Sequence, residues 1–264
     1  MARTATTLLR MVNMILVRLR ETTVTTISGS GITAHASLAG TGKTPSYTDT
    51  IVRLINDAKI EVEDSYDWIE LRQMISVLVE SGEITNNIYD DASTARQQGD
   101  KRGSDNQEHT GPRSRVISVW NYTTNSYLKG RPYDWMLRQH NDAFISGATG
   151  EPMFWTVGPP GNMTNDALDL KTYPVSDGSY ELEVQLYNPQ EDLSADADSF
   201  LAPWNPIYLR ALALAIRERG EDEGEQFSDV MKAYEMALGN EIAYEQKHQH
   251  HGLGGGDWTV VGDY

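Results

Sequence analysis

Apolar residues recur at steps of three and four along two stretches of the N-terminal half. Between residues 7 and 20 they predict an amphipathic helix, and from Ile51 to Val62 they predict a second, longer one. Ser46 or Thr48 precedes the second stretch, and either residue is able to cap a helix N-terminus. We therefore expect two helices here, each with one face buried against another element.

Two further helices are expected in the C-terminal third, on either side of the acidic sequence RGEDEGE. The first covers about residues 207–219, where alternate alanines leave a slim surface for close packing. The second covers about residues 224–249 and carries large apolar residues at steps of four, three, four and four. Together with the N-terminal pair they predict a helical body of about four helices, formed by residues 1–80 and 203–251.

The middle of the chain shows short β-branched and aromatic runs between Asn, Gly and Pro turns, a pattern typical of strands. One strand is expected at residues 72–79. Five more are expected at residues 116–120, 126–129, 153–157, 168–173 and 181–187. In the last of these, Leu and Val alternate with Glu and Gln, so one face is buried and the other is exposed. The five strands predict a small antiparallel sandwich or barrel with a helical turn near residues 132–141. The fold class is then α+β, with residues 81–202 as a β-rich insertion in the helical bundle.

Two segments stand apart from these elements. Residues 90–115 hold no large apolar side chain and predict a long flexible loop inside the insertion. Residues 252–264, GLGGGDWTVVGDY, predict an extended C-terminal tail in which a glycine hinge precedes a short strand-competent stretch. Such a stretch is suited to add an edge strand to another subunit, the alternative being a frayed terminus. The partner-binding residues expected in the tail are Asp257, Trp258, Thr259, Val260, Val261 and Tyr264.

The charge of the chain narrows the classes of function. A net charge of −16 argues against a dedicated nucleic-acid binder, which needs clustered Lys and Arg, and against binding to an anionic membrane surface. Residues 181–245 alone carry −11 of this charge. The chain has no cysteine, which excludes disulfides and thiolate metal sites. Arg10, Arg18 and Arg20 interrupt the N-terminal apolar run, so that run does not predict a signal peptide.

Candidate chemistry in the sequence is sparse. GTGKT at residues 40–44 resembles the end of a phosphate-binding loop, but Ser37 stands where the pattern needs a glycine. Three histidines near the end of the last helix have two alternative interpretations. They form a divalent metal site, or they interact favourably with the helix dipole. They are His248, His250 and His251. Carboxylate pairs such as Glu61 with Asp64 lie on hydrophilic helix faces, where nothing shifts a pKa for acid or base catalysis. We expect no catalytic site, no cofactor and no metal.

The order of these elements resembles a known family. The chain runs from LLRMVNMIL through YTDTIVRLINDAKIEVEDSYDWIELR to TYPVSDGSYELEVQLYNPQEDLSADADSFLAP and ALALAIRERGEDEGEQFSDVMKAYEMALGNEIAYE. In this order and composition it is similar to the head-to-tail adaptor, or connector, proteins of tailed bacteriophages, which short-tailed phages call tail tubular protein A. The resemblance covers most of the chain and rests on composition and spacing.

The resemblance implies a structural virion protein that forms a ring, commonly of twelve copies, at the head-to-tail junction. Such a ring docks beneath the capsid portal protein, presents its far face to the tail nozzle or tail tube protein, and lets DNA pass through its lumen during ejection without sequence-specific contacts. It implies no membrane partner, and residence in the host cytoplasm before assembly. The tail after Gly252 fits the C-terminal arm of this family, and one hypothesis is that it docks in a portal crevice.

Two other functions remain open at this point. One is another virion protein of the tail or collar, such as a tail-completion protein. The other belongs to a different class, a nucleotide-binding enzyme that uses Lys43 of the GTGKT sequence. For the isolated chain we expect a monomer, because its net charge opposes self-association until a template ring supplies compensating contacts.

Overall fold

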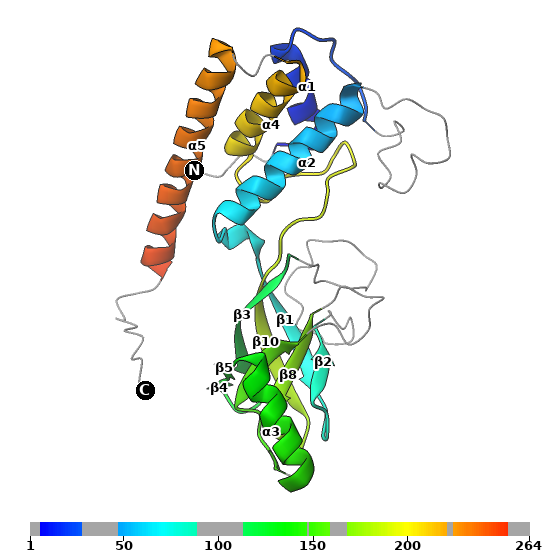
Figure 1. Ribbon diagram of the computed structural model, residues 1–264, viewed down its shortest axis with the longest axis vertical. Coiled ribbons are helices and arrows are strands. Elements are labelled where there is room, and N and C mark those ends of the chain that lie inside the picture. The colour runs from blue at the N-terminus through cyan, green and yellow to red at the C-terminus, as the bar shows by residue number, and fades with distance from the viewer. Residues whose placement is uncertain are drawn as a thin grey trace, which may run out of the picture. The chain divides into compact units, whose positions relative to one another are not determined.

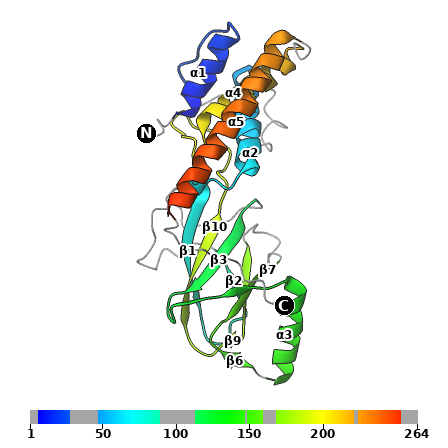
Figure 2. The same ribbon diagram turned by 90° about the vertical axis from the view of Figure 1, so that its left-hand side faces the viewer.

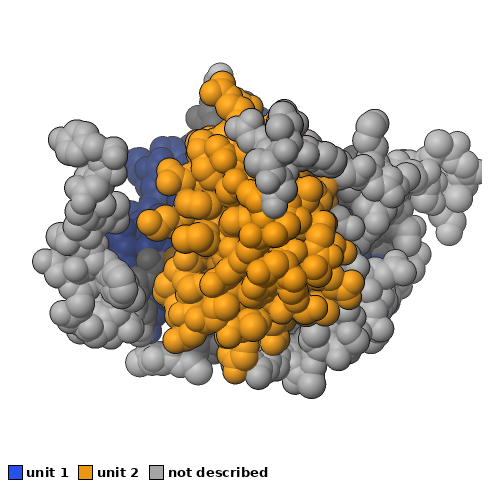
Figure 3. All heavy atoms as spheres, turned by 90° about the horizontal axis from the view of Figure 1, so that it is seen from below, with its two compact units in different colours: residues 1–70, 190–264 blue, residues 71–189 orange. Residues whose placement is uncertain are grey.

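The computed structural model describes residues 6–27, 47–88, 113–146, 148–158, 168–220 and 224–252 (Figure 1). They form an α+β fold in which helices and mostly antiparallel strands belong to two compact units, as the sequence predicts. Unit 1 comprises Met1–Glu70 and Gln190–Tyr264, and unit 2 comprises Leu71–Pro189. Figure 3 colours the two units separately. The β-rich unit is therefore an insertion between the two halves of the helical one.

Unit 1 is a helical body built around one slim helix. Its helices are α1 (Leu8–Arg18), α2 (Tyr47–Ser65), α4 (Trp204–Glu218) and α5 (Glu225–Gly252). The central helix is α4, which contacts each of the other three (Figures 1 and 2). Its buried face includes three alanines, Ala211, Ala213 and Ala215, whose small side chains allow the neighbouring helices to approach closely. The four helices predicted from apolar spacing are all present.

A polar row on α2 fixes the segment that leads from unit 2 back into unit 1. Asn56 Nδ2 donates to the carbonyl of Leu193, and the Leu193 N–H donates to Asn56 Oδ1, both at 3.0 Å. One turn further on, Lys59 Nζ donates to the carbonyl oxygens of Gln190 and Glu191. Both side chains are buried, and their bonds satisfy backbone groups of this segment, of which those of Leu193 are themselves buried.

The long helix α5 is held by contacts at two levels along its length. Tyr234 Oη donates to Glu61 Oε1 of α2 at 3.2 Å, and Arg210 Nε of α4 donates to Glu61 Oε2 at 2.7 Å. Burial and the neighbouring Glu61 carboxylate raise the pKa of Tyr234 to about 12. Closer to the C-terminal end of α5, Glu245 Oε1 accepts a hydrogen bond from the N–H of Ile69 at 3.0 Å. The helix is therefore tied to unit 1 well beyond its first turns.

The described residues of unit 2 form two four-stranded sheets and one short strand pair. The first sheet has the order β1 (Arg72–Val79), β10 (Tyr180–Tyr187), β3 (Arg115–Asn121) and β4 (Ser126–Tyr127). The second has the order β2 (Thr85–Asn87), β8 (Asp169–Tyr173), β7 (Phe154–Gly158) and β5 (Lys129–Gly130). The pairing is antiparallel except for β5 with β7 and β6 (Thr149–Gly150) with β9 (Val175–Ser176), which are parallel. One core joins the two sheets, because Val184 and Val119 of the first share it with Leu170 of the second.

Helix α3 (Tyr133–Ser146) packs on β7 and β8, and it is a 14-residue helix where the sequence predicts only a helical turn. Trp135 makes edge-to-face contacts with Phe154 and Tyr173. His140 lies beside the Tyr173 ring with 7% of its surface exposed, and neither ring nitrogen has a hydrogen-bond partner within the described residues. Burial, and then the positive charge of Lys171, lower the pKa of His140.

The boundary between the units differs from the division expected at residues 80/81 and 202/203. Strand β1 pairs with β10 along all eight of its residues, from Arg72↔Tyr187 to Val79↔Tyr180, so it belongs to the β-rich unit. The two ends of the insertion meet where the Asn188 N–H donates to the Leu71 carbonyl at 2.8 Å. The segment after Pro189 lies on α2 instead and belongs to the helical unit. Tertiary pairing, which apolar spacing does not reveal, sets these limits.

Candidate interaction groove

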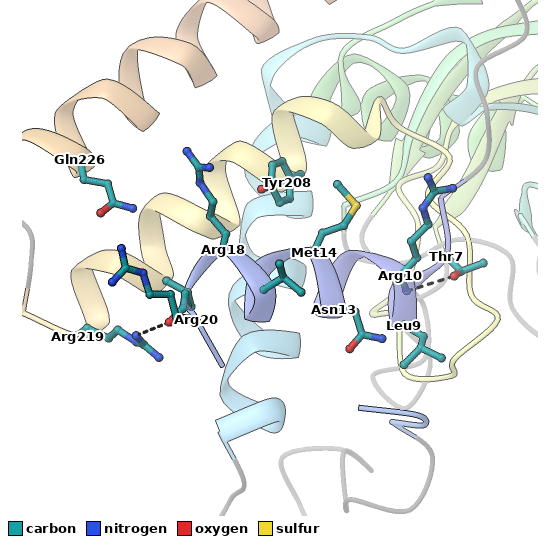
Figure 4. A pocket seen from close by; sticks show the side chains of 12 residues that line it. Thr7, Leu9, Arg10, Asn13, Met14, Arg18, Arg20, Tyr208, Arg219 and Gln226 are labelled. Atoms are coloured by element: carbon teal, nitrogen blue, oxygen red, sulfur yellow. Dashed lines mark hydrogen bonds between the residues drawn. The ribbon is translucent and has the colours of Figure 1, made fainter. Parts of the chain in front are cut away.

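An open groove with a volume of about 1150 Å³ lies on unit 1, along α1 and beside α4 and the start of α5 (Figure 4). Helix α1 buries Leu8, Met11, Val12, Ile15 and Leu16 against the body. The opposite side of this amphipathic helix is left to line the groove. We call this feature the α1 groove. Its lining comprises Thr7, Leu9, Arg10, Asn13, Met14, Val17, Arg18, Leu19, Arg20, Tyr208, Arg219 and Gln226.

The α1 groove has apolar side chains at its centre. Leu9 and Met14 are half-buried, and Val17 has 61% of its surface exposed, which is high for an aliphatic side chain on a helix. Tyr208 of α4 contributes an aromatic ring with a polar tip. A partner that covers exposed apolar area of this kind lowers the free energy of the complex.

Four arginines surround these apolar side chains, and no Asp or Glu lines the α1 groove. Arg10, Arg18 and Arg20 are exposed, and within the described residues no carboxylate forms an ion pair with them. The arginines reflect a sharp segregation of charge along the chain. Residues 1–20 contain four arginines and no acidic residue, so the rest of the chain carries a net charge of −20. The groove is thus a local basic site on an acidic protein.

Arg219, just after α4, has a structural role at one end of the groove. Its Nη1 donates to the Leu19 carbonyl at 3.1 Å, its Nε donates to Tyr47 Oη at 2.9 Å, and its Nη2 donates to the Glu21 carboxylate. The hydrogen bond to Tyr47, followed by the bond to Glu21, raises the pKa of Arg219. The guanidinium therefore joins the end of α1 to the start of α2 and keeps this end of the groove in shape.

Arg20 occupies a backbone position that glycine normally fills. Its φ is 62°, and its N–H and that of Glu21 donate to the carbonyls of Val17 and Leu16, which closes the last turn of α1. A left-handed conformation costs a residue with a Cβ about 1 kcal/mol relative to glycine. The side chain at this position adds a guanidinium to the lining of the groove, near Arg219 (Figure 4).

The residues singled out from the sequence are not the residues of this groove. The expected partner-binding residues Asp257, Trp258, Thr259, Val260, Val261 and Tyr264 lie outside the described residues, as does GTGKT at residues 40–44. The last helix contains His248, His250 and His251, but their side chains are not described. Across the part of the chain that the structure describes, no three His, Asp or Glu side chains are placed to hold a metal ion.

Sequence reasoning missed the α1 groove although part of its signal was visible. The arginines of the first helix interrupt an apolar run, which argues against a signal peptide but does not by itself indicate a groove. The more informative observation is that the first acidic residue of the chain is Glu21. A helix whose charged residues are all basic, in a chain of opposite net charge, indicates a contact surface.

Comparison of the chain with protein-family models and with curated proteins finds no match. The described helices include none that combines the length and apolar character needed to cross a lipid bilayer.

Proposed function

We propose that this chain is a head-to-tail adaptor of a tailed bacteriophage, a structural protein whose ring joins the capsid portal to the tail. The proposal rests on the family resemblance of the sequence, and one structural observation supports it. A helical unit made from both ends of the chain carries a β-rich unit inserted in its middle. Members of the family that the sequence resembles typically have such a helical bundle with an inserted β-domain. In this function the portal, the tail nozzle or tube protein and further copies of the chain are its partners.

The charge of the chain is compatible with a channel for DNA. A net charge of −16 repels the phosphate backbone over a Debye length of about 8–10 Å, so DNA passes without adhering. The α1 groove has an apolar centre as well as arginines. A surface of that composition is better suited to protein than to DNA, because phosphate contacts gain nothing from aliphatic side chains.

The proposal is tested by capture on immobilised portal rings from the same virus. The full chain is expected to be retained and then to recruit the tail nozzle or tube protein. A chain that ends at Gly252 keeps every described residue and lacks only the arm. It is expected to be retained at least tenfold less, whether the arm binds the portal itself or joins neighbouring copies in the ring. Thermal unfolding of both forms serves as the folding control. A full chain that does not bind portal rings at any concentration tested contradicts the proposal.

The two alternatives give different results in the same preparation. A tail-completion or collar protein binds virion layers other than the portal, and localisation in intact particles by electron microscopy identifies the layer. A nucleotide-binding enzyme binds ATP and loses that binding on Lys43→Ala, at a residue that lies outside the described ranges.

A further inference from the structure

We infer that the α1 groove binds residues 253–264 of a second copy of this chain. The inference deepens the proposed function, on which its setting in a ring rests, by naming the site that receives the arm. It assigns the arm to a neighbouring subunit instead of a portal crevice. Three observations carry it: the composition of the groove, the charge of the segment, and the distance that the segment is able to span.

The chemistry of the groove and that of the segment are complementary. Residues 253–264 contain no Lys or Arg. Their apolar side chains are Leu253, Trp258, Val260 and Val261, and their acids are Asp257 and Asp263. The groove offers apolar side chains between arginines and no acid. Arginine pairs with a carboxylate through two parallel hydrogen bonds and also stacks on an indole ring. A short acidic segment with an aromatic anchor therefore satisfies both kinds of surface in the groove at once.

The acid run at residues 221–223, close in sequence to Arg219, is the strongest competing occupant from the same copy. These residues lie outside the described ranges. They supply three carboxylates but no apolar side chain, and therefore nothing that would cover Val17 or Met14. The segment at residues 253–264 supplies both.

The length of α5 keeps the arm of the same copy away from one end of the groove. Gln226, which lines the groove, lies 26 residues before Gly252 on this helix, a rise of about 39 Å. Trp258 lies six residues beyond Gly252, and six extended residues span at most about 22 Å. Trp258 of the same chain therefore cannot reach the end of the groove where Gln226, Arg219 and Arg18 gather (Figure 4). Only a second copy is able to place its aromatic anchor there.

This contact is heterologous, since each copy donates one arm and receives one. Contacts of that type generate closed rings or open filaments, whereas a contact between identical patches stops at a dimer. The arrangement is thus consistent with the ring of the proposed function.

The absence of cysteine from the chain allows a direct test by disulfide cross-linking. One full-length variant carries Val17→Cys in the groove and a second carries Val260→Cys in the arm. The two are mixed and oxidised, both in solution at high concentration and on portal rings. A cross-linked dimer of one copy of each variant is expected. The matched control replaces the groove cysteine by Arg53→Cys, which is exposed on α2 and does not line the groove. Its yield should be at least tenfold lower.

Charge and backbone variants of the cross-linking pair exclude a chance encounter. Arg10→Glu with Arg18→Glu is expected to reduce the yield at least tenfold, whereas Arg53→Glu should leave it unchanged. Arg20→Gly is the sharper variant, because it relieves the left-handed backbone and removes one guanidinium. We expect an unchanged or higher melting temperature together with a lower cross-linking yield.

The opposing outcomes are equally distinct. A monomeric product from a chain that carries both cysteines, without dimer, means that the arm folds back on its own copy and overturns the inference. Yields equal to that of the Arg53→Cys control in both settings also overturn it. If the full chain still binds portal rings in that case, the proposed function stands and the arm binds elsewhere. Efficient cross-linking without portal capture supports the binding of the arm in the α1 groove and contradicts the proposed function.

Discussion

His140 shows how one buried side chain makes the stability of unit 2 depend on pH. The imidazole is buried beside Tyr173, and within the described residues neither nitrogen finds a partner. Burial, and then Lys171, lower its pKa in the folded protein from the ordinary value of 6.5. Below pH 6.5 the unfolded chain therefore binds a proton that the folded chain does not, so acid destabilises the fold.

The expected effect is a loss of up to about 1.4 kcal/mol for each pH unit below 6.5, until the folded pKa is reached. His140→Leu removes the titrating group and keeps an apolar side chain of similar size against Tyr173. Calorimetric melting of both forms between pH 5 and 7.5 checks this. The melting temperature of the natural chain should fall more steeply with acid than that of the variant. Parallel profiles would show that His140 is not the group responsible.

Individual residues are also where the sequence was least informative about the site. Arg10 and Arg18 are recognisable as the polar face of a predicted helix, but Arg219 joins the groove from about 200 positions later. Arg20 appears helical in the sequence, because no local pattern indicates that a residue other than glycine adopts a φ of 62°. The groove depends on long-range contacts, which apolar periodicity does not encode.

At the scale of elements, α2 binds the segment from Gln190 to Leu193 through side chains and not through a sheet or a second helix. Asn56→Ala is expected to lower the free energy of unfolding by about 2–3 kcal/mol, because it leaves the buried N–H and carbonyl of Leu193 without partners. Asp57→Ala, the exposed neighbour on the same helix, should change it by less than about 0.5 kcal/mol. Urea unfolding followed by circular dichroism measures both. Equal effects would mean that the bonds of Asn56 contribute no net stability.

The type of most elements could be predicted from the sequence, whereas their partners could not. Four helices and the main strands follow from apolar spacing and turn residues, with differences of a few positions at their ends. The short strands β2, β6 and β9 were missed, since two or three residues carry no detectable period. Helix α3 is longer than the predicted helical turn, and its Trp135 packs on Phe154 of β7 and Tyr173 of β8. The strand at residues 72–79 was predicted, but within the helical body of residues 1–80, whereas β1 pairs with β10 in unit 2.

At the scale of the whole molecule, unit 2 is an insertion with its own core and adjacent ends. The core joins both sheets, and the ends meet at the hydrogen bond from Asn188 to Leu71. A fragment of residues 71–189 is therefore expected to fold alone. It should show a cooperative thermal transition and a β-rich circular dichroism spectrum. A fragment of residues 81–202, which lacks β1, should not, because β10 then loses its partner along eight residues. Folding of both fragments, or of neither, would contradict this prediction.

The adjacent ends of unit 2 also determine how the chain bears a mechanical load. Strands β1 and β10 lead to the two connections with unit 1 and are paired at that end, Arg72 opposite Tyr187. Tension between the units therefore pulls both strands in the same direction and is shared by two covalent connections. In an excised unit 2 held by its two termini, the same strands are pulled apart, and their hydrogen bonds break one after another, as in a zipper. Optical-tweezer measurements should accordingly find a lower unfolding force for the excised unit, pulled by its two termini, than for the unit in the intact chain, pulled between unit 1 and unit 2.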